Sequence, residues 1–133
     1  MRCEFTAGHS RYFLAIVDGE PGGMLKYRKA ECPVPGGDSN AIEIQQLYVL
    51  ATMQRHGLGR QLTQCVYAFA EQSETNGVWL SAWEFADWAT RFYERVGFSA
   101  IGKVEFELGA TTYTDLLMWR PVGQRSRGEL DNG

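Results

Sequence analysis

The stretch LYVLATMQRHGLGRQL, residues 47–62, decides the fold of this chain. It opens as the end of an apolar strand, and from Gly57 onward its apolar residues take the spacing of an amphipathic helix. Gly57 and Gly59 therefore stand where a strand ends and a helix begins. The backbone N–H groups of the first helical turn converge there at the positive end of the helix dipole, which predicts a cradle for an anion. The apolar stripe of the helix comprises Leu58, Leu62, Cys65, Val66 and Phe69.

A G-x-G pair is also typical of a tight turn with close backbone approach, and that structural interpretation stands beside the anion cradle. Two other phosphate motifs are excluded by the residues present. A dinucleotide fingerprint needs a small residue at position 62, which is leucine, and a P-loop needs Gly-Lys followed by Ser or Thr, where the chain has Gly59-Arg60-Gln61. No acidic pair is placed for magnesium, so we expect a pyrophosphate bound without a metal. Positive charge at its rim is expected from Arg55, His56 and Arg60.

The segments before this stretch predict strands. Residues 12–17 and 23–28 are extended runs joined through the turn Asp18-Gly19, which indicates a β-hairpin. Residues 41–50 have the β-branched and aromatic content of a strand. The alternation in that strand is broken at Gln45-Gln46-Leu47, which indicates a β-bulge.

The segments after it predict a helix end, a strand, a second helix and a hairpin. Asn76-Gly77 has residues suited to a left-handed helix end, and residues 78–83 are typical of a buried strand. Asp87 is expected to cap a second helix, which Gly97 ends. The apolar positions of this helix are Trp88, Ala89, Phe92, Tyr93 and Val96. The strands of the closing hairpin are expected at 98–108 and 113–119, joined by Gly109-Ala110-Thr111-Thr112.

Length, composition and charge bound the class of protein. The chain has 133 residues, a formal charge of −3 and 44% hydrophobic residues, which is typical of one globular domain. The order of elements predicts an α/β or α+β domain, a mixed sheet flanked by helices, over residues 1–121, with a disordered tail at 122–133. No segment approaches the roughly 18 apolar residues of a membrane-spanning helix. The acidic balance disfavours nucleic acid as a partner.

The cysteines and the N-terminal residues favour a cytoplasmic protein. Met1–Ser10 lacks the apolar core of a signal peptide, and three widely spaced cysteines fit a reducing compartment. No two cysteines form a C-x-x-C pair, and neither histidine stands at ligand spacing from them, so we expect no metal site. Cys65 lies on the apolar stripe and is expected to be an inert core residue rather than a covalent nucleophile.

Two motifs make the chain resemble the GNAT superfamily of acyl-CoA N-acyltransferases. The motif Q/R-x-x-G-x-G/A is QRHGLG at residues 54–59, and A-x-x-F-Y-x-x-x-G-F is ATRFYERVGF at residues 89–98. The resemblance covers residues 12–121 and is closest to the spermine/spermidine N-acetyltransferase branch. It implies a splayed GNAT-type sheet, here lacking most of the usual N-terminal strand and helices. The residues that favour the branch are Trp83-Glu84, Phe92-Tyr93 and Thr114-Asp115-Leu116.

The resemblance implies acetyl-CoA as the acyl donor, bound between two splayed strands. By position, the backbone of Leu47, Tyr48 and Val49 would bind the pantetheine arm, because an extended arm adds to an exposed strand edge. Two positions depart from the family pattern: Ala51 replaces a proline, and Ala86 replaces an asparagine that faces the cofactor. The residues implied at the pyrophosphate are Gln54, Arg55, His56, Gly57, Leu58, Gly59 and Arg60.

Transfer to an amine needs a base, because an alkylammonium with a pKa of about 10 must lose a proton before it attacks. Glu43, on the strand expected to face the acyl group, is the predicted base, and a carboxylate held in an ion pair is the alternative. The resemblance implies that Tyr93 protonates the leaving thiolate; from its helix position alone, core packing is favoured instead. Aromatic faces with carboxylates suit a cationic amine. Residues expected to line that acceptor site are Tyr48, Trp83, Glu84 and Tyr113.

The expected function is transfer of an acetyl group from acetyl-CoA to a small primary amine or polyamine, by direct attack in a ternary complex. Two alternatives stay open: acetylation of a peptide or protein amino terminus, and a non-catalytic CoA-binding module. Only about ten residues precede the first predicted hairpin. Three expectations follow from this: the acceptor site is open, a partner subunit supplies its wall, or the chain is a shortened product of a longer one. Exposed strand edges and the missing N-terminal layer predict a homodimer.

Overall fold

The computed structural model describes residues 2–7, 10–33 and 38–122, with side chains described from Ser10 onward except that of Arg55. The predicted disordered tail begins at residue 122, but Val122 is buried and its N–H donates to the carbonyl oxygen of Asn76 at 3.1 Å. Val122 therefore belongs to the folded domain. The remainder of the predicted tail lies outside the described residues.

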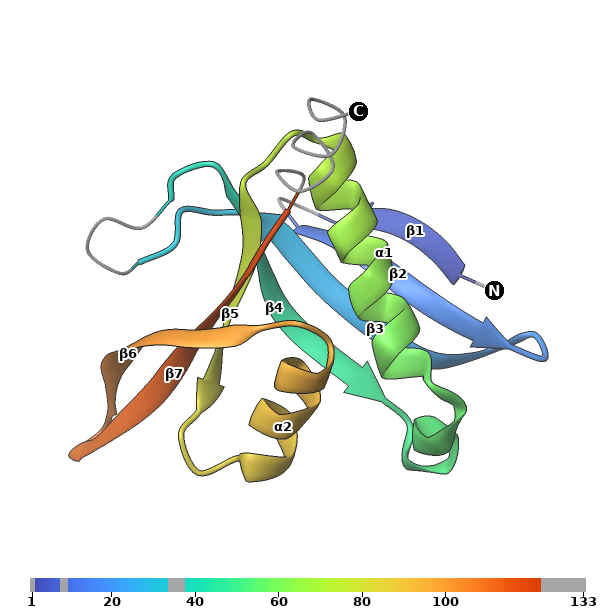
Figure 1. Ribbon diagram of the computed structural model, residues 1–133. Helices are drawn as coiled ribbons and strands as arrows, with labels where there is room; N and C mark the ends of the chain where they lie inside the picture. Colours follow the sequence, from blue (N-terminus) through green and yellow to red (C-terminus); the bar gives the residue numbers. More distant parts are fainter. Residues whose placement is uncertain (1, 8–9, 34–37, 123–133) are drawn as a thin grey trace.

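Seven strands form one mixed sheet among the described residues, with the spatial order β1-β2-β3-β4-β5-β7-β6 (Figure 1). The strands are β1 (Arg2–Ala7), β2 (Ser10–Val17), β3 (Glu20–Lys29), β4 (Ala41–Val49), β5 (Gly77–Trp83), β6 (Ser99–Leu108) and β7 (Thr111–Pro121). The helices are the 3-10 helix η1 (Ala51–His56) and the α-helices α1 (Leu58–Gln72) and α2 (Asp87–Arg95). Neighbouring strands are antiparallel except β4 and β5, which are parallel and joined through α1. The predicted class, a mixed sheet flanked by helices, is confirmed.

Helices α1 and α2 cover the same face of the sheet. β5 and β6 both pair antiparallel with β7, so β4, β5 and β6 run in one direction. Right-handed crossovers that step the same way across a sheet place their helices on one face. The two helices also meet, because Gly59 in the first turn of α1 lies against the ring of Phe92 on α2. The main core therefore lies between these helices and the sheet.

The opposite face of the sheet is covered by neither α1 nor α2. Val78 and Leu80 on β5 point into the main core, whereas Trp79 between them points to the other side. We call the two sides the helix face and the helix-free face. A second, smaller cluster on the helix-free face comprises Cys32, Ala41, Trp79 and Leu117.

Three local predictions are confirmed. Asp18 and Gly19 have φ values of 52° and 80°, as a two-residue hairpin turn of this hand requires. The register of β3 against β4 shifts so that Gln45 is an extra residue, which is the predicted bulge. Gly97 has a φ of 103°, a left-handed conformation that glycine adopts without strain, just after α2 ends.

One strand was not predicted, and the predicted end of helix α1 is wrong. An edge strand, β1, pairs with β2, and the alternation of apolar and polar residues from Arg2 to Ala7 is the signal that the prediction overlooked. Helix α1 ends at Gln72 rather than at Asn76, and the left-handed residue is Glu74. The hydroxyl of Thr75 donates to the carbonyl oxygen of Ala70 at 2.8 Å, which satisfies a helix-end acceptor before the chain enters β5.

Three further details differ in the second half of the chain. Asp87 is the first residue of α2 rather than its cap. Its negative charge at the positive end of the helix dipole stabilises the helix. Trp88 is 79% exposed rather than part of the apolar face. Leu108 pairs with Thr111, so the closing hairpin has a two-residue loop rather than four residues. None of the described helices is long and apolar enough to cross a membrane.

We expect Gly77→Ala to destabilise the fold, because a Cβ atom at this position would overlap the indole ring of Trp119. Overpacking of this kind costs about 1–3 kcal/mol in the free energy of unfolding. Denaturant unfolding of Gly77→Ala, Trp119→Leu and the double variant measures the coupling. Gly77→Ala should lower the free energy of unfolding much less in the Trp119→Leu protein than in the wild type. Equal decreases in the two proteins would contradict the contact.

Candidate active site

The sheet is split between β4 and β5. The two strands pair only at their first residues, Ala41 with Gly77 through Glu43 with Trp79. Beyond that point β4 continues along β3, and β5 continues along β7. The facing edges of β4 and β5 therefore carry backbone N–H and C=O groups without a strand partner, and such an edge accepts an extended ligand. The strands diverge toward the end of the molecule that holds η1 and α2 (Figure 1). We call this open region the wedge.

The bulge in β4 lies where the wedge begins. Gln45 is the extra residue, and the hydroxyl of Ser10 donates to its side-chain oxygen at 3.0 Å. A bulge bends its strand and increases its twist, which turns β4 away from β5. Ile44 before the bulge and Leu47 after it both pack against the main core, so the strand keeps its apolar face while it changes direction.

The wide end of the wedge meets the first turn of α1. Gly57 occupies the N-cap position with a φ of 73°, and no side chain caps the helix. No acidic residue stands in the first turn, and Arg60 there is exposed. The N–H groups of this turn and the helix dipole thus favour an anion, and the pyrophosphate site expected there stays a prediction. His56 is exposed beside it, and Gln54 donates a long hydrogen bond of 3.4 Å to the Val49 carbonyl oxygen.

The two glycines of the G-x-G pair are required for different reasons. Gly57 has open space around it but a left-handed backbone, whereas a Cβ atom on Gly59 would lie 3.0 Å from the ring of Phe92. Gly57 therefore shapes the turn, and Gly59 allows α2 to pack closely on α1. The structural interpretation of the motif is thus seen in the structure, as a turn at Gly57 and close packing at Gly59. The anion cradle stays a prediction.

Tyr93 follows Phe92 on α2 and packs against the main core. Its ring contacts the rings of Phe92 and Phe98 edge-on, with centroids 5.3 Å and 5.8 Å away. Burial removes water from the phenol and raises the pKa of Tyr93 to about 12. At neutral pH the hydroxyl is therefore a hydrogen-bond donor, and no described residue is bonded to it.

Glu43 is the last residue of β4 that pairs with β5, and it lies on the helix-free face. Its carboxylate accepts a hydrogen bond from Nε of Arg28 at 2.8 Å, across from it on β3. The ion-pair interpretation of Glu43 is therefore present in the structure, and Arg28 is a site residue that the sequence analysis missed. Arg28 pairs with Glu43 only because the register of β3 against β4 shifts at the bulge, and this register could not be deduced from the sequence.

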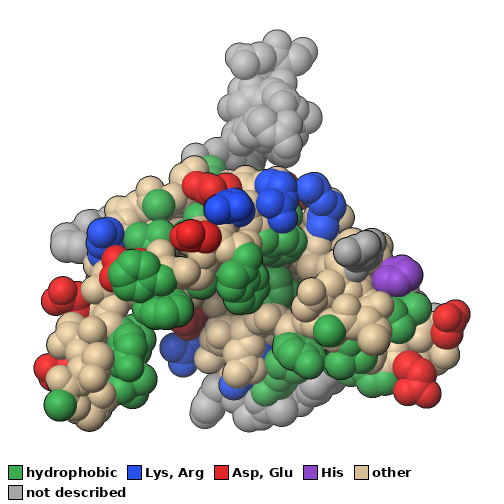
Figure 2. Space-filling view, turned by 90° about the horizontal axis from the view of Figure 1, so that it is seen from below, with side chains coloured by type: hydrophobic (Ala, Val, Ile, Leu, Met, Phe, Trp, Pro, Cys, Tyr) green, Lys and Arg blue, Asp and Glu red, His purple; other side chains and the backbone are tan. Residues whose placement is uncertain are grey.

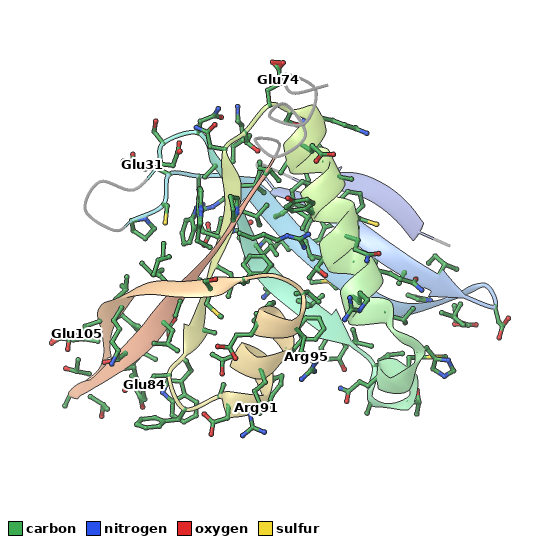
Figure 3. All side chains as sticks on the ribbon, viewed as in Figure 1. Glu31, Glu74, Glu84, Arg91, Arg95 and Glu105 are labelled. Atoms are coloured by element: carbon green, nitrogen blue, oxygen red, sulfur yellow. The ribbon has the colours of Figure 1, made fainter. Side chains whose placement is uncertain are left out.

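The expected acceptor residues lie at the wide end of the wedge but do not all face the same way. Trp83 ends β5 on the helix-free face and is 48% exposed, and Tyr48 near the end of β4 is 59% exposed. Tyr113 on β7 stacks against Phe106, with ring centroids 5.6 Å apart. Glu84 instead pairs with Lys103 at 3.9 Å (Figure 3). Seen from this end, hydrophobic side chains surround a hollow between the β6–β7 hairpin and the rest of the domain (Figure 2).

Asp115 is a second residue that the sequence analysis did not assign. It stands directly across from Trp83 in the pairing of β5 with β7, and two residues from Tyr113, so all three lie on the helix-free face. The carboxylate is half-buried and has no ion-pair partner among the described residues. Asp115 lies beside Trp83 because β7, the last strand in the chain, pairs with β5 in the sheet.

Outside the wedge, the described residues form a further hollow and no metal-ligand cluster. A hollow of about 280 Å³ lies over α1 and β2, and it shares no residue with the wedge. Within the described part of the chain, no group of three or more His, Cys, Asp or Glu side chains is placed to hold a metal ion. The hollow is lined by Ala15, Gln61, Leu62, Gln64 and Cys65.

Sequence comparisons match the chain to one family. A model described as the Acetyltransferase (GNAT) family matches residues 1–98. A protein of Lactobacillus delbrueckii subsp. lactis, an uncharacterized N-acetyltransferase in the pepI 3′ region, is 33% identical over 113 residues. That alignment covers 85% of this chain and 65% of the relative. The chain thus spans somewhat less than two thirds of the length of this curated relative.

Solved structures share the fold. Nourseothricin acetyltransferase superposes with a TM-score of 0.71 at 24% identity, over 85% of this chain and 65% of that one. A Bacillus anthracis protein described as a streptothricin acetyltransferase, in complex with acetyl coenzyme A, superposes with a TM-score of 0.73 at 17% identity. It covers 87% of this chain and 64% of that one. At these identities the likeness concerns the arrangement of strands and helices.

The raised pKa of Tyr93 predicts a pH dependence of stability. The unfolded chain releases the phenol proton near pH 10, whereas the folded chain holds it to about pH 12. The stabilisation is therefore complete below pH 10 and is lost as the pH rises through 12, by about 2–3 kcal/mol. Urea unfolding of the wild type and Tyr93→Phe between pH 8 and 12 isolates this difference. Parallel pH profiles of the two proteins would contradict it.

Proposed function

We propose that this chain, which belongs to the acetyltransferase (GNAT) family, transfers an acetyl group from acetyl-CoA to a primary amine. The observation that carries the proposal is the wedge, whose unpaired strand edges end at the uncapped first turn of α1. An extended arm that ends in a pyrophosphate fits this arrangement, because the strand edge offers amide hydrogen bonds and the helix terminus favours negative charge.

Donor binding is assigned to backbone groups in two places. The edge of β4 at Leu47, Tyr48 and Val49 binds the pantetheine arm, and the segment Gln54–Arg60 holds the pyrophosphate. Ala86, at the N-cap of α2, offers no polar side chain to this ligand. The donor supplies a thioester carbonyl, and the bound arm places it near the narrow end of the wedge, where β4 and β5 meet.

The acceptor amine approaches from the helix-free face. Helices α1 and α2 fill the other side, and Glu43 lies on the helix-free side where the strands part. Direct attack by the amine nitrogen on the thioester carbon then forms the amide and breaks the carbon–sulfur bond, with no acyl-enzyme. Cys65 on α1 is buried at a distance from this face, as part of the main core.

The proton movements divide between Glu43 and Tyr93. The acceptor ammonium loses one proton to Glu43, directly or through water, before attack. Tyr93 stands on the helix side and donates a hydrogen bond to the sulfur as it gains charge. A free thiol has a pKa of about 8.5, so a phenol with a pKa of about 12 stabilises the thiolate rather than ionising ahead of it. The nitrogen loses its second proton as the amide forms, and solvent carries a proton to the released thiolate, so that amide and free thiol are the products.

A cationic amine or polyamine is the acceptor class we favour. Asp115 supplies a negative charge that no described cation neutralises, and the exposed ring of Trp83 stands across from it. A carboxylate beside an aromatic face attracts an ammonium group. A peptide amino terminus is the second candidate, because the open helix-free face and unpaired strand edges also admit an extended chain.

We expect Glu43→Gln to lower kcat by about 10²-fold, since general-base catalysis contributes at least that much, with acetyl-CoA affinity unchanged. Arg28→Gln is the matched control, because it removes the same ion pair and leaves the carboxylate. Steady-state kinetics and calorimetric titration with acetyl-CoA, with NADH as a control ligand, separate the roles. Equal losses of kcat in Glu43→Gln and Arg28→Gln would show that activity requires the ion pair rather than a general base. Absence of acetyl-CoA binding by the folded chain would refute the whole proposal.

We expect Asp115→Asn to raise the KM for a diamine or spermidine about tenfold, because it removes the charge that attracts the second ammonium group. Its effect on a monoamine should be smaller, and kcat should stay within about threefold. Glu105→Gln is the control: it removes an exposed carboxylate from neighbouring β6. Acceptor kinetics on both amines measure the difference, and equal KM values in Asp115→Asn and the wild type would exclude this role.

A further inference from the structure

Strand β6 ends the sheet on one side and leaves one of its own edges open. Among the described strands it pairs with β7 alone, so the backbone N–H and C=O groups along its outer edge have no strand partner there. No residue of β6 is buried. Its side chains Ile101, Phe106 and Leu108 are among the large hydrophobic side chains identified as exposed. Apolar side chains and unpaired backbone groups on one edge together favour the addition of another strand.

Two opposite charges stand close together on this strand. Lys103 and Glu105 lie on the helix face, because Val104 between them packs against the cluster of the helix-free face. Glu105 forms no ion pair with any described residue, and its labelled side chain in Figure 3 lies on the β6–β7 hairpin, away from α1. The ammonium group of Lys103 is 3.9 Å from the carboxylate of Glu84, a long contact. Charges on an edge strand oppose pairing with another strand unless opposite charges face each other.

A second copy of β6 meets this condition in the register centred on Val104. Identical strands that pair antiparallel about a two-fold axis place residue i opposite residue j and j opposite i, with the facing side chains on one side of the sheet. With the axis at Val104, Lys103 of each copy faces Glu105 of the other. Moving the axis to Lys103 or to Glu105 would set that residue against its own copy, with like charges facing.

The helix-free side is complementary in the same register. Gly102 of one copy faces Phe106 of the other, and the two Val104 side chains meet at the axis. A glycine on an edge strand leaves a gap in the row of side chains, and an aromatic ring on the neighbouring strand covers such a gap. Phe106 is already oriented by its stacking on Tyr113, with ring centroids 5.6 Å apart. The regular part of β6 begins after the bulge at Ile101.

We propose that two copies of this chain form a dimer through β6, by antiparallel pairing of residues 102–106 with the same residues of the second copy. The two seven-stranded sheets then join into one continuous sheet. The homodimer expected from exposed strand edges is thereby assigned a surface and a register. A pairing of this length makes a small interface, so the dimer should dissociate on dilution. The outer edge of β6 is separated from the wedge by β7, so each copy keeps its own wedge and acetyl transfer should not require the dimer.

Charge reversal tests the proposed register. Sedimentation velocity over a series of protein concentrations measures the Kd of dimerisation, and the wild type should become dimeric as the concentration rises. Lys103→Glu and Glu105→Lys should each raise this Kd by about tenfold or more, because each sets like charges opposite each other at two symmetry-related places. An equimolar mixture of the two variants should associate with a Kd within about threefold of the wild type, because every facing pair is then opposite in charge.

Glu107→Lys is the matched control. It makes the same change of net charge on the same strand as Glu105→Lys, but in this register position 107 faces Ile101 rather than a charge. It should change the Kd of dimerisation by less than about threefold. A wild type that stays monomeric at every concentration would overturn the inference. So would single variants that dimerise like the wild type, a mixture that stays monomeric, or a loss in Glu107→Lys as large as that in Glu105→Lys.

Discussion

The interrupted pairing of β4 with β5 is the constraint on which the rest of the structure depends. Three facing positions hold the strands together, and the bulge at Gln45 then turns β4 away. A parallel pair that stayed closed would satisfy every backbone group on both edges and leave no wedge. The sheet survives the split because each strand keeps its other neighbour, β3 for β4 and β7 for β5. Stability is therefore supplied by the two halves, and the gap between them is available for binding.

The residues of the proposed mechanism lie on both faces of the split sheet. Tyr93 is held by the core on the helix face, while Glu43 and Asp115 lie on the helix-free face. A donor threaded through the wedge from the helix side would meet its acceptor from the other side. In this arrangement the proposed hydrogen-bond donor to sulfur, Tyr93, and the proposed base, Glu43, need not share one pocket, so the phenol and the carboxylate keep different environments.

The local structure of the chain was predictable where it depends on short-range chemistry. The turn at Asp18-Gly19, the bulge at Gln45 and the helix that follows Gly57 all follow from residue type and spacing. Strand pairing was not predictable, because it depends on contacts between distant segments. The ion pair of Glu43 with Arg28 and the position of Asp115 beside Trp83 therefore required the structure. The close contact of Gly77 in β5 with Trp119 in β7 likewise required the structure.

The contact between Gly59 and Phe92 joins the first turn of α1, where we propose that the donor pyrophosphate binds, to helix α2, which carries Tyr93. It sets how closely α2 approaches the first turn of α1, and Tyr93 is the next residue along α2. A side chain at position 59 would push the Phe92 ring and with it the helix that carries the phenol, because packed interiors transmit such shifts. The G-x-G motif thus has a packing role beside the anion-binding role that we propose for its backbone N–H groups. A substitution at position 59 that left the backbone of this turn intact would still shift the Tyr93 hydroxyl, which we propose donates a hydrogen bond to the thioester sulfur.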